Sequence, residues 1–152
     1  MPPQLGQHFR ERLSKAEAAL QSVTEATASG VDSKGVWTRR QVLGHLLDSA
    51  ANNHIRFVDA AINGEYSGPK YDSDEWVRLH DYANLSWSFL LEQWHVRNVM
   101  LAQVVDHIPE DKLSAQCTIG EDKPVTLKFV IEDYLDHLDS HVSEITSRAT
   151  AA

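Results

Sequence analysis

The sequence predicts a single all-α domain, a four-helix bundle with two long crossover connections. Its length of 152 residues suits one domain spanning positions 1–152. Hydrophobic residues make up 42% and charged residues 24%, close to the average of folded soluble proteins. In four segments, apolar residues recur every three or four positions, which is the period of an amphipathic helix.

The first two helices carry recognisable start and stop signals. The first is expected over Leu5–Ala28, with Gly30 ending it. The second is expected over Thr38–Asn63. Thr38 and Gln41 have the spacing of a capping box, in which a hydroxyl and an amide satisfy the first free N–H groups of a helix.

The other two helices are expected over Ser86–His107 and Thr126–Arg148. Pro109 ends the earlier one, because proline cannot continue a helix. Thr126 is a plausible N-cap of the later one, whose apolar stripe is expected to include Phe129. These two segments complete the bundle.

The connections Gly64–Leu85 and Pro109–Val125 are longer than bundles usually need. In the first we expect a helical turn starting at Ser73, and in the second two short extended pieces within 117–125. Long connections are compatible with crossover topologies, and binding residues often lie on them.

Charge and cysteine content restrict the partners and the compartment. The formal net charge is −8, which disfavours a phosphate backbone as a partner. The single cysteine, Cys117, cannot form an internal disulfide, which fits a reducing cytosol. No stretch approaches the roughly 18 consecutive apolar residues of a membrane span. We therefore expect a cytoplasmic protein with a small-molecule partner and neither nucleic acid nor membrane.

Two histidines of the last segment have the spacing of metal ligands. His137 and His141 are four residues apart, which places both rings on one helix face about one turn apart. Neutral imidazole is the commonest side-chain metal ligand. The alternative, a chance pair on a solvated face, is weakened by the apolar residues on either side of the pair.

The second helix supplies the third candidate ligand, His45. With Asp48, Ser49 and Asn52 it forms a polar strip on an otherwise apolar helix. Such a strip is costly inside a protein unless its groups are satisfied, either by a metal site or by hydrogen bonds around a core histidine. Gly44 costs about 1 kcal/mol relative to alanine in a helix, and close approach of a backbone or ligand would explain it.

Several segments resemble the DinB-like superfamily, in particular the branch named for metal-dependent hydrolases. They are Trp37–Ala50, Tyr71–Val77, and Pro124–Leu127 through Asp133–His141. The single histidine of the first and the histidine pair of the last are the most specific part. The resemblance implies a four-helix bundle of up-down-down-up topology, a site for a divalent ion at His45, His137 and His141, and a homodimer.

The resemblance also implies a choice of activities. The superfamily includes transferases that use the thiols bacillithiol and mycothiol, and a mycothiol-dependent isomerase. Three protein ligands leave a coordination position open, as in catalytic sites. We expect Zn, Ni or Fe, with Cu also compatible, to activate a low-molecular-weight thiol for transfer to a small electrophile. A hydrolase that activates water and a non-catalytic, stress-related metal-binding module are the alternatives.

Three further residues are assigned roles around this site. Asp48 is nearly one turn from His45 and is expected to orient a ligand ring or to accept a proton. Tyr71 and Trp76, in the first long connection, are expected to form a wall of the pocket.

Overall fold

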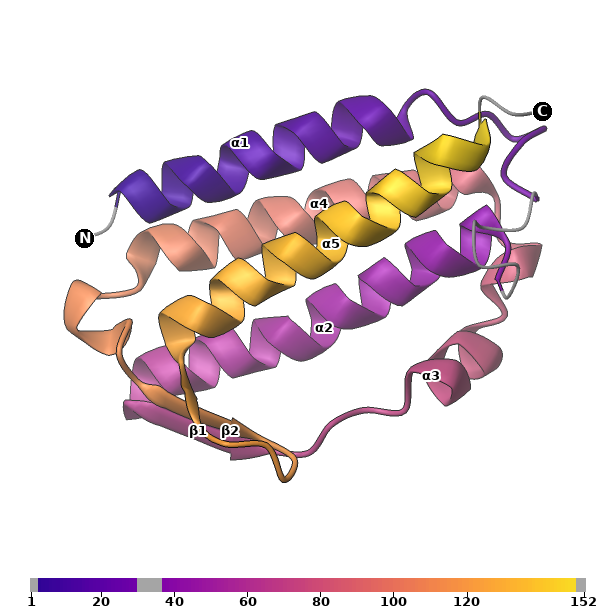
Figure 1. The fold of residues 1–152 in the computed structure, drawn as a ribbon. Helices are drawn as coiled ribbons and strands as arrows, with labels where there is room; N and C mark the ends of the chain where they lie inside the picture. Colours follow the sequence, from indigo (N-terminus) through magenta and orange to yellow (C-terminus); the bar gives the residue numbers. More distant parts are fainter. Residues whose placement is uncertain (1–2, 30–36, 150–152) are drawn as a thin grey trace.

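The computed structural model describes residues 3–29 and 37–149, and four long helices dominate it (Figure 1). The helices α1 and α5 run in one direction along the bundle, and α2 and α4 run in the other. The expected four-helix bundle with up-down-down-up topology is thus confirmed. The bounds of these helices are α1 Pro3–Leu20, α2 Arg39–Asn63, α4 Trp87–His107 and α5 Leu127–Ala149.

Because α2 and α4 are parallel, the chain must return along the whole bundle between them. The return contains β1 (Glu65–Gly68), α3 (Ser73–His80) and the short helix η1 (Tyr82–Asn84). The helix at Ser73 is therefore confirmed, whereas β1 was not anticipated.

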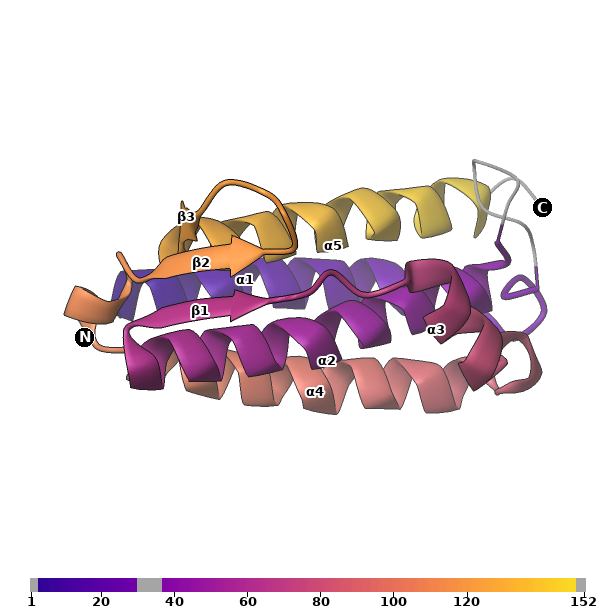
Figure 2. The ribbon, with the colours of Figure 1, turned by 90° about the horizontal axis from the view of Figure 1, so that it is seen from below.

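The connection from α4 to α5 contains η2 (Glu110–Lys112) and the strands β2 (Gln116–Ile119) and β3 (Val125–Thr126). The strand order is β1-β2-β3, with β1 parallel and β3 antiparallel to β2. This small sheet lies along one side of the bundle, next to α2 and the beginning of α5 (Figure 2). The expected extended pieces are confirmed.

The two ends of α2 follow the sequence signals. The Thr38 hydroxyl accepts a hydrogen bond from the Gln41 backbone N–H at 3.2 Å, and the Thr38 N–H donates to the Gln41 side chain at 2.8 Å. Gly64 ends the helix with φ of 77°, a left-handed conformation that favours glycine. This capping box, which begins at Thr38 seven residues before His45, fixes the start of α2.

The first helix is shorter than expected, since α1 ends at Leu20 and not at Ala28. Val23 and Ala28 are nevertheless buried, so the apolar spacing continues beyond the helix. The hydroxyls of Ser22 and Thr27 donate to nearby backbone carbonyls, which gives the chain an alternative to helical hydrogen bonds. Because residues with the apolar spacing stay buried after the helix has ended, that spacing predicted a first helix that was too long.

Phe129 was also assigned wrongly, because its side chain is 52% exposed. The inward positions of α5 begin at Leu127 and continue through Val130, Ile131 and Tyr134. At 100° per residue, position 129 lies roughly 150° from the centre of that stripe, on the far side of α5.

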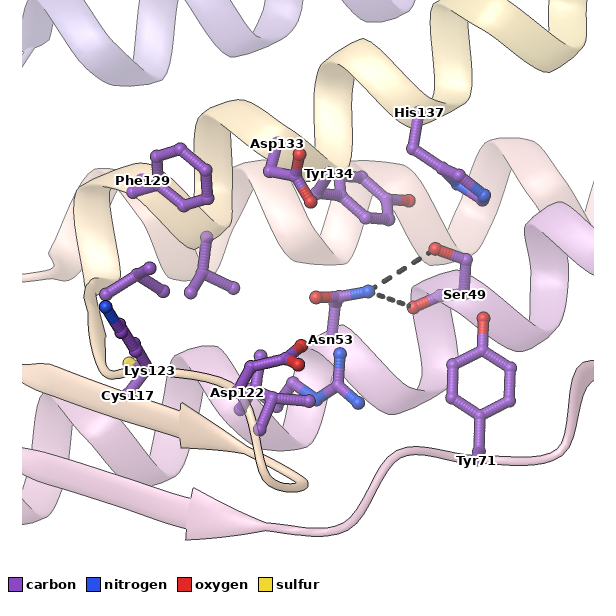
Figure 3. Close-up of a pocket in the computed structure, with 14 residues that line it drawn as sticks. Ser49, Asn53, Tyr71, Cys117, Asp122, Lys123, Phe129, Asp133, Tyr134 and His137 are labelled. Atoms are coloured by element: carbon purple, nitrogen blue, oxygen red, sulfur yellow. Dashed lines mark hydrogen bonds between the residues drawn. The ribbon is translucent and has the colours of Figure 1, made fainter.

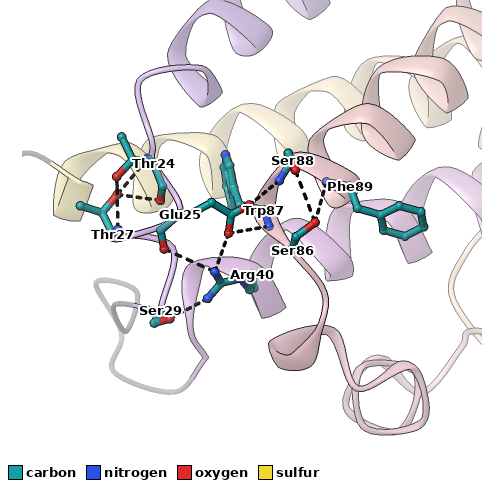
Figure 4. A network of polar contacts seen from close by, with 9 residues as sticks. All are labelled: Thr24, Glu25, Thr27, Ser29, Arg40, Ser86, Trp87, Ser88 and Phe89. Carbon is teal, nitrogen blue, oxygen red and sulfur yellow. Dashed lines mark hydrogen bonds and ion pairs between the residues drawn. The ribbon is translucent and has the colours of Figure 1, made fainter.

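The segment after α1 is attached to two helices by Glu25 (Figure 4). Its carboxylate accepts the backbone N–H groups of Trp87 at 3.1 Å and Ser88 at 3.0 Å, at the start of α4. It also accepts a hydrogen bond from Arg40 of α2 at 2.7 Å. These donors, Ser88 first, lower the pKa of Glu25 to about 2. A negative charge at this place also complements the α4 dipole.

Candidate metal centre

The structure brings together the three histidines that the sequence singled out. His45 comes from α2, and His137 and His141 come from α5, which packs against it. The Nε2 atom of His137 lies 3.2 Å from Nε2 of His45 and 3.1 Å from Nε2 of His141. Within the described residues, this is the group of three side chains close enough to share one metal ion.

Neighbouring side chains hold two of the rings in place. His45 is 5% exposed and its ring lies 5.2 Å from that of Trp37, centre to centre. Nδ1 of His141 lies 3.2 Å from a carboxylate oxygen of Glu144. A carboxylate accepts, so Nδ1 carries the proton and the Nε2 lone pair of His141 faces the other histidines.

Two of the three nitrogen–nitrogen distances are those of ligands that share one divalent ion, and all three ligand atoms lie within 4.8 Å of one another. Nitrogen atoms 3.1–3.2 Å apart subtend an angle of about 100° at an ion bound at the usual Zn–N distance of about 2.0–2.1 Å. This angle lies between the octahedral and tetrahedral values. Imidazole nitrogens suit Zn, Ni and Fe.

A cavity of about 280 Å³ adjoins the histidines, between α2, α5 and the sheet (Figure 3). His137 lines it, and the hydroxyl of Tyr71 points toward Ser49 in the same region. Polar groups from α2 and apolar groups from the sheet face each other across it. The other residues that line it are Asn53, Arg56, Cys117, Ile119, Asp122, Lys123, Val125, Phe129, Val130, Asp133 and Tyr134.

Burial keeps the ionisable hydroxyl and thiol groups of this cavity protonated. It raises the pKa of Tyr71, against smaller opposing effects of Ser49 and Arg56. It likewise raises the pKa of the Cys117 thiol. Tyr71 is therefore a neutral hydrogen-bond donor, and Cys117 is part of the wall and not a thiolate nucleophile.

Asp48 and Trp76 lie in a second cavity, of about 210 Å³, together with His80 and Tyr82. The Asp48 carboxylate accepts a hydrogen bond from the Tyr82 hydroxyl at 2.5 Å, and Nδ1 of His80 lies 3.7 Å from it. Burial raises the pKa of Asp48. The structure thus groups Tyr71 with His137, and Trp76 with Asp48, although the rings of Tyr71 and Trp76 are only 5.6 Å apart.

Gly44 is explained by an aromatic side chain, and not by a backbone or a ligand as expected. A Cβ atom at this position would lie 2.0 Å from a ring carbon of Tyr82. The glycine therefore lets Tyr82 pack directly on α2, one residue before His45.

Sequence reasoning missed Glu144, Asn53 and Arg56. Glu144 is three residues after His141, a spacing at which side chains on a helix meet. Asn53 and Arg56 follow Ser49 by four and seven residues and therefore share its face. The sequence analysis placed Asn52 in the polar strip and left out Asn53 and Arg56. In the structure the Asn52 amide donates a hydrogen bond to the Asp48 carbonyl.

Two solved structures share this fold. YfiT of Bacillus subtilis superposes with a TM-score of 0.85 at 22% identity, covering 99% of this chain and 89% of that one. The mycothiol-dependent maleylpyruvate isomerase superposes with a TM-score of 0.79 at 16% identity, covering 95% of this chain and 61% of that one. YfiT has an unusual four-helix bundle topology.

Curated relatives are named as candidate metal-dependent hydrolases. One from Oceanobacillus iheyensis is 34% identical over 116 residues, which cover 74% of this chain and 65% of the relative. YfiT is 28% identical over 144 residues, which cover 92% of this chain and 79% of YfiT. The DinB superfamily model matches residues 8–145, including all three histidines. The chain belongs to the DinB superfamily.

Proposed function

We propose that this chain is a divalent-metal-dependent enzyme that activates a low-molecular-weight thiol for attack on a small electrophile. The observation that carries the proposal is the convergence of the His45, His137 and His141 Nε2 atoms beside a cavity. An ion held by three neutral imidazoles would keep its full positive charge and would lower the pKa of a thiol or a water that approaches it.

The residues around the histidines position the reactants. Glu144 fixes the proton of His141 on Nδ1, so that Nε2 stays available. Tyr71, neutral because of its burial, donates a hydrogen bond toward bound substrate. Ile119 and Val125 contribute apolar surface that displaces water from the cavity.

For Asp48 the contacts favour a positioning role. Its carboxylate holds the Tyr82 hydroxyl, and the Tyr82 ring packs on Gly44 beside His45. Asp48 therefore fixes the connection between α3 and α4 against the helix that carries one of the proposed ligands. Trp76 lines the second cavity together with Asp48, and its ring lies next to that of Tyr71.

Hydrolysis, with water as the nucleophile, is the second candidate. It is supported by the names of the curated relatives, which describe metal-dependent hydrolases. A metal-binding module without catalysis is the third. We further propose that the protein is a homodimer whose partners are small molecules. No helix in residues 3–29 and 37–149 is long and apolar enough to cross a membrane.

Metal analysis of tag-free protein tests the site. The parent should bind about one ion per chain, and His45→Ala and His141→Ala should lose most of it, because two imidazoles bind more weakly than three. His107→Ala is the matched control, since His107 is an exposed histidine that contacts its own helix. Equal metal in the parent and in both site variants would show that the triad is not the site.

An activity assay distinguishes a thiol from water as the nucleophile. A chlorinated electrophile is offered with and without a cysteine-based thiol, and both chloride and the thioether are measured. In thiol transfer the new S–C bond forms as the C–Cl bond breaks, and the thiol proton leaves to solvent. We expect turnover that depends on the thiol in the metal-loaded parent and is absent in His141→Ala. Turnover without thiol would assign the site to hydrolysis.

A further inference from the structure

Arg56 is a buried cation that faces the cavity lined by His137. It is 8% exposed and lines the cavity from α2. Its guanidinium donates to the Pro69 carbonyl at 3.5 Å and lies 6.0 Å from the centre of the Tyr71 ring. In the part of the chain that the structure describes, no carboxylate forms an ion pair with it.

This arrangement is costly unless something else pairs with the charge. Arginine carries five N–H donors, and the long contact to Pro69 uses one of them. Burial of a charge without a partner is strongly unfavourable. The charge is felt inside the cavity, because it opposes the effect of burial on the pKa of Cys117.

The carboxylates near the cavity mouth do not satisfy Arg56. Asp122 is paired with Lys70 at 3.1 Å, and both side chains are more than half exposed. Asp133 and Lys123 are exposed and of opposite sign, so their charges largely offset each other in solvent. Arg56 is therefore a buried cation of this cavity that is available to pair with a bound anion.

Arg56 and His45 also lie on one face of α2. His45, Ser49, Asn53 and Arg56 follow each other by four, four and three residues, which keeps them on one side of the helix. The backbones of His45 and Arg56 are 11 residues apart, which is roughly 16 Å along the axis of α2. The distance between their side chains is shorter, because a long side chain on a helix points toward the N-terminus. An extended small molecule that contacts Arg56 in the cavity can therefore reach along this face of α2 toward His45.

We propose that the substrate of this site carries a carboxylate that pairs with Arg56 while its reacting end lies at the histidines. The assignment of the reacting end rests on the proposed function. The planar guanidinium fork matches the two oxygens of a carboxylate. One buried cation, in a protein of net charge −8, suits a singly charged group better than a phosphate dianion.

The test uses succinate as the probe and succinamide as its uncharged counterpart. Binding to the full chain is followed by NMR, on the Nε–H signal of Arg56 and the side-chain amide of Asn53, first without metal so that chelation of an ion does not contribute. We expect saturable shifts with succinate and none with succinamide. Arg56→Gln should weaken succinate binding about 10- to 100-fold, the loss typical of a charged hydrogen-bonded pair.

Two further variants complete the comparison. Arg56→Lys keeps the charge but loses the fork, and should bind succinate with intermediate strength. Arg78→Gln removes an exposed arginine of α3, with the same change of net charge, and should bind as the parent does. Equal binding of succinate and succinamide by the parent would overturn the proposal even if Arg56→Gln did not fold.

The outcomes separate this inference from the proposed function. If succinate binds through Arg56 but the protein takes up no metal, the anion site is supported and the proposed metal-dependent enzyme is rejected. If metal binds at the histidines but Arg56→Gln does not change the affinity for succinate, the metal site is supported and the anion site is rejected.

Discussion

Two carboxylates respond to this fold in opposite ways. Asp48 is buried between α2 and η1, and burial raises its pKa. Glu25 receives N–H donors from α4 and from Arg40, and its pKa falls to about 2. The charge on Asp48 is therefore unfavourable to the folded state, and the charge on Glu25 is favourable to it.

We expect Asp48→Asn to change how stability depends on pH. The pKa of Asp48 is higher in the folded state than its unfolded value of 3.8, so its cost is fully present above the folded pKa and fades as pH falls toward 3.8. Relative to the variant, the parent should gain stability between pH 7 and pH 4, measured by urea unfolding. Exposed Asp111 provides the control, Asp111→Asn. A parent-to-variant difference that is the same at both pH values contradicts the prediction.

A second prediction concerns Gly44. Alanine here gains about 1 kcal/mol of helix propensity, but its Cβ would lie 2.0 Å from the Tyr82 ring. Overpacking of this kind costs about 1 to 3 kcal/mol, so we expect a net loss of stability in Gly44→Ala. In a Tyr82→Leu background the same substitution should cost less, and chemical denaturation of the four proteins measures this coupling. Additive effects would mean that Tyr82 is not the obstacle.

Among the secondary-structure elements, those set by local sequence signals were predicted correctly, and those set by pairing with distant parts of the chain were not. The bounds of α2 followed from Thr38, Gln41 and Gly64, whose hydrogen bonds and dihedral angle are local. Strand β1 was missed because it pairs Glu65 with Gln116, a partner in a distant part of the chain. Sequence spacing put three histidines on two helix faces, but which side chains share a cavity depends on how those helices, α3 and the sheet pack.

The loop after α1 offers a prediction at this scale, because Glu25 joins it to α2 and α4. Glu25→Gln should lower the melting temperature at pH 7. The pKa of Glu25 is about 2 in the folded state against an ordinary value of 4.5, so its contribution is present above pH 4.5 and is lost as pH falls toward 2. The melting temperatures of the parent and the variant should converge over that range. Glu121→Gln, at an exposed turn, is the control, and a constant difference down to pH 2 would contradict the assignment.

For the molecule as a whole, the proposed ion would connect α2 to α5. An ion that binds the folded state alone, at 100 times its dissociation constant, stabilises it by about 2.7 kcal/mol. For a chain of this size that corresponds to roughly 5 to 10 °C in melting temperature. We expect the melting temperature of the parent to rise with metal concentration and to fall after chelation. His107→Ala should behave like the parent and His141→Ala should not respond; a response of His141→Ala equal to the parent's would place the ion elsewhere.

The separation of the histidines along the chain has a consequence during synthesis. His45 and His137 are 92 residues apart, so a ribosome adding about 5 to 20 residues per second needs roughly 5 to 20 s between them. Until the last helix emerges, the polar face of α2 has no counterpart and nothing can assemble around His45. A nascent chain stalled in that interval exposes this face to proteases and chaperones, and the proposed ion can be bound by all three histidines only after α5 has emerged.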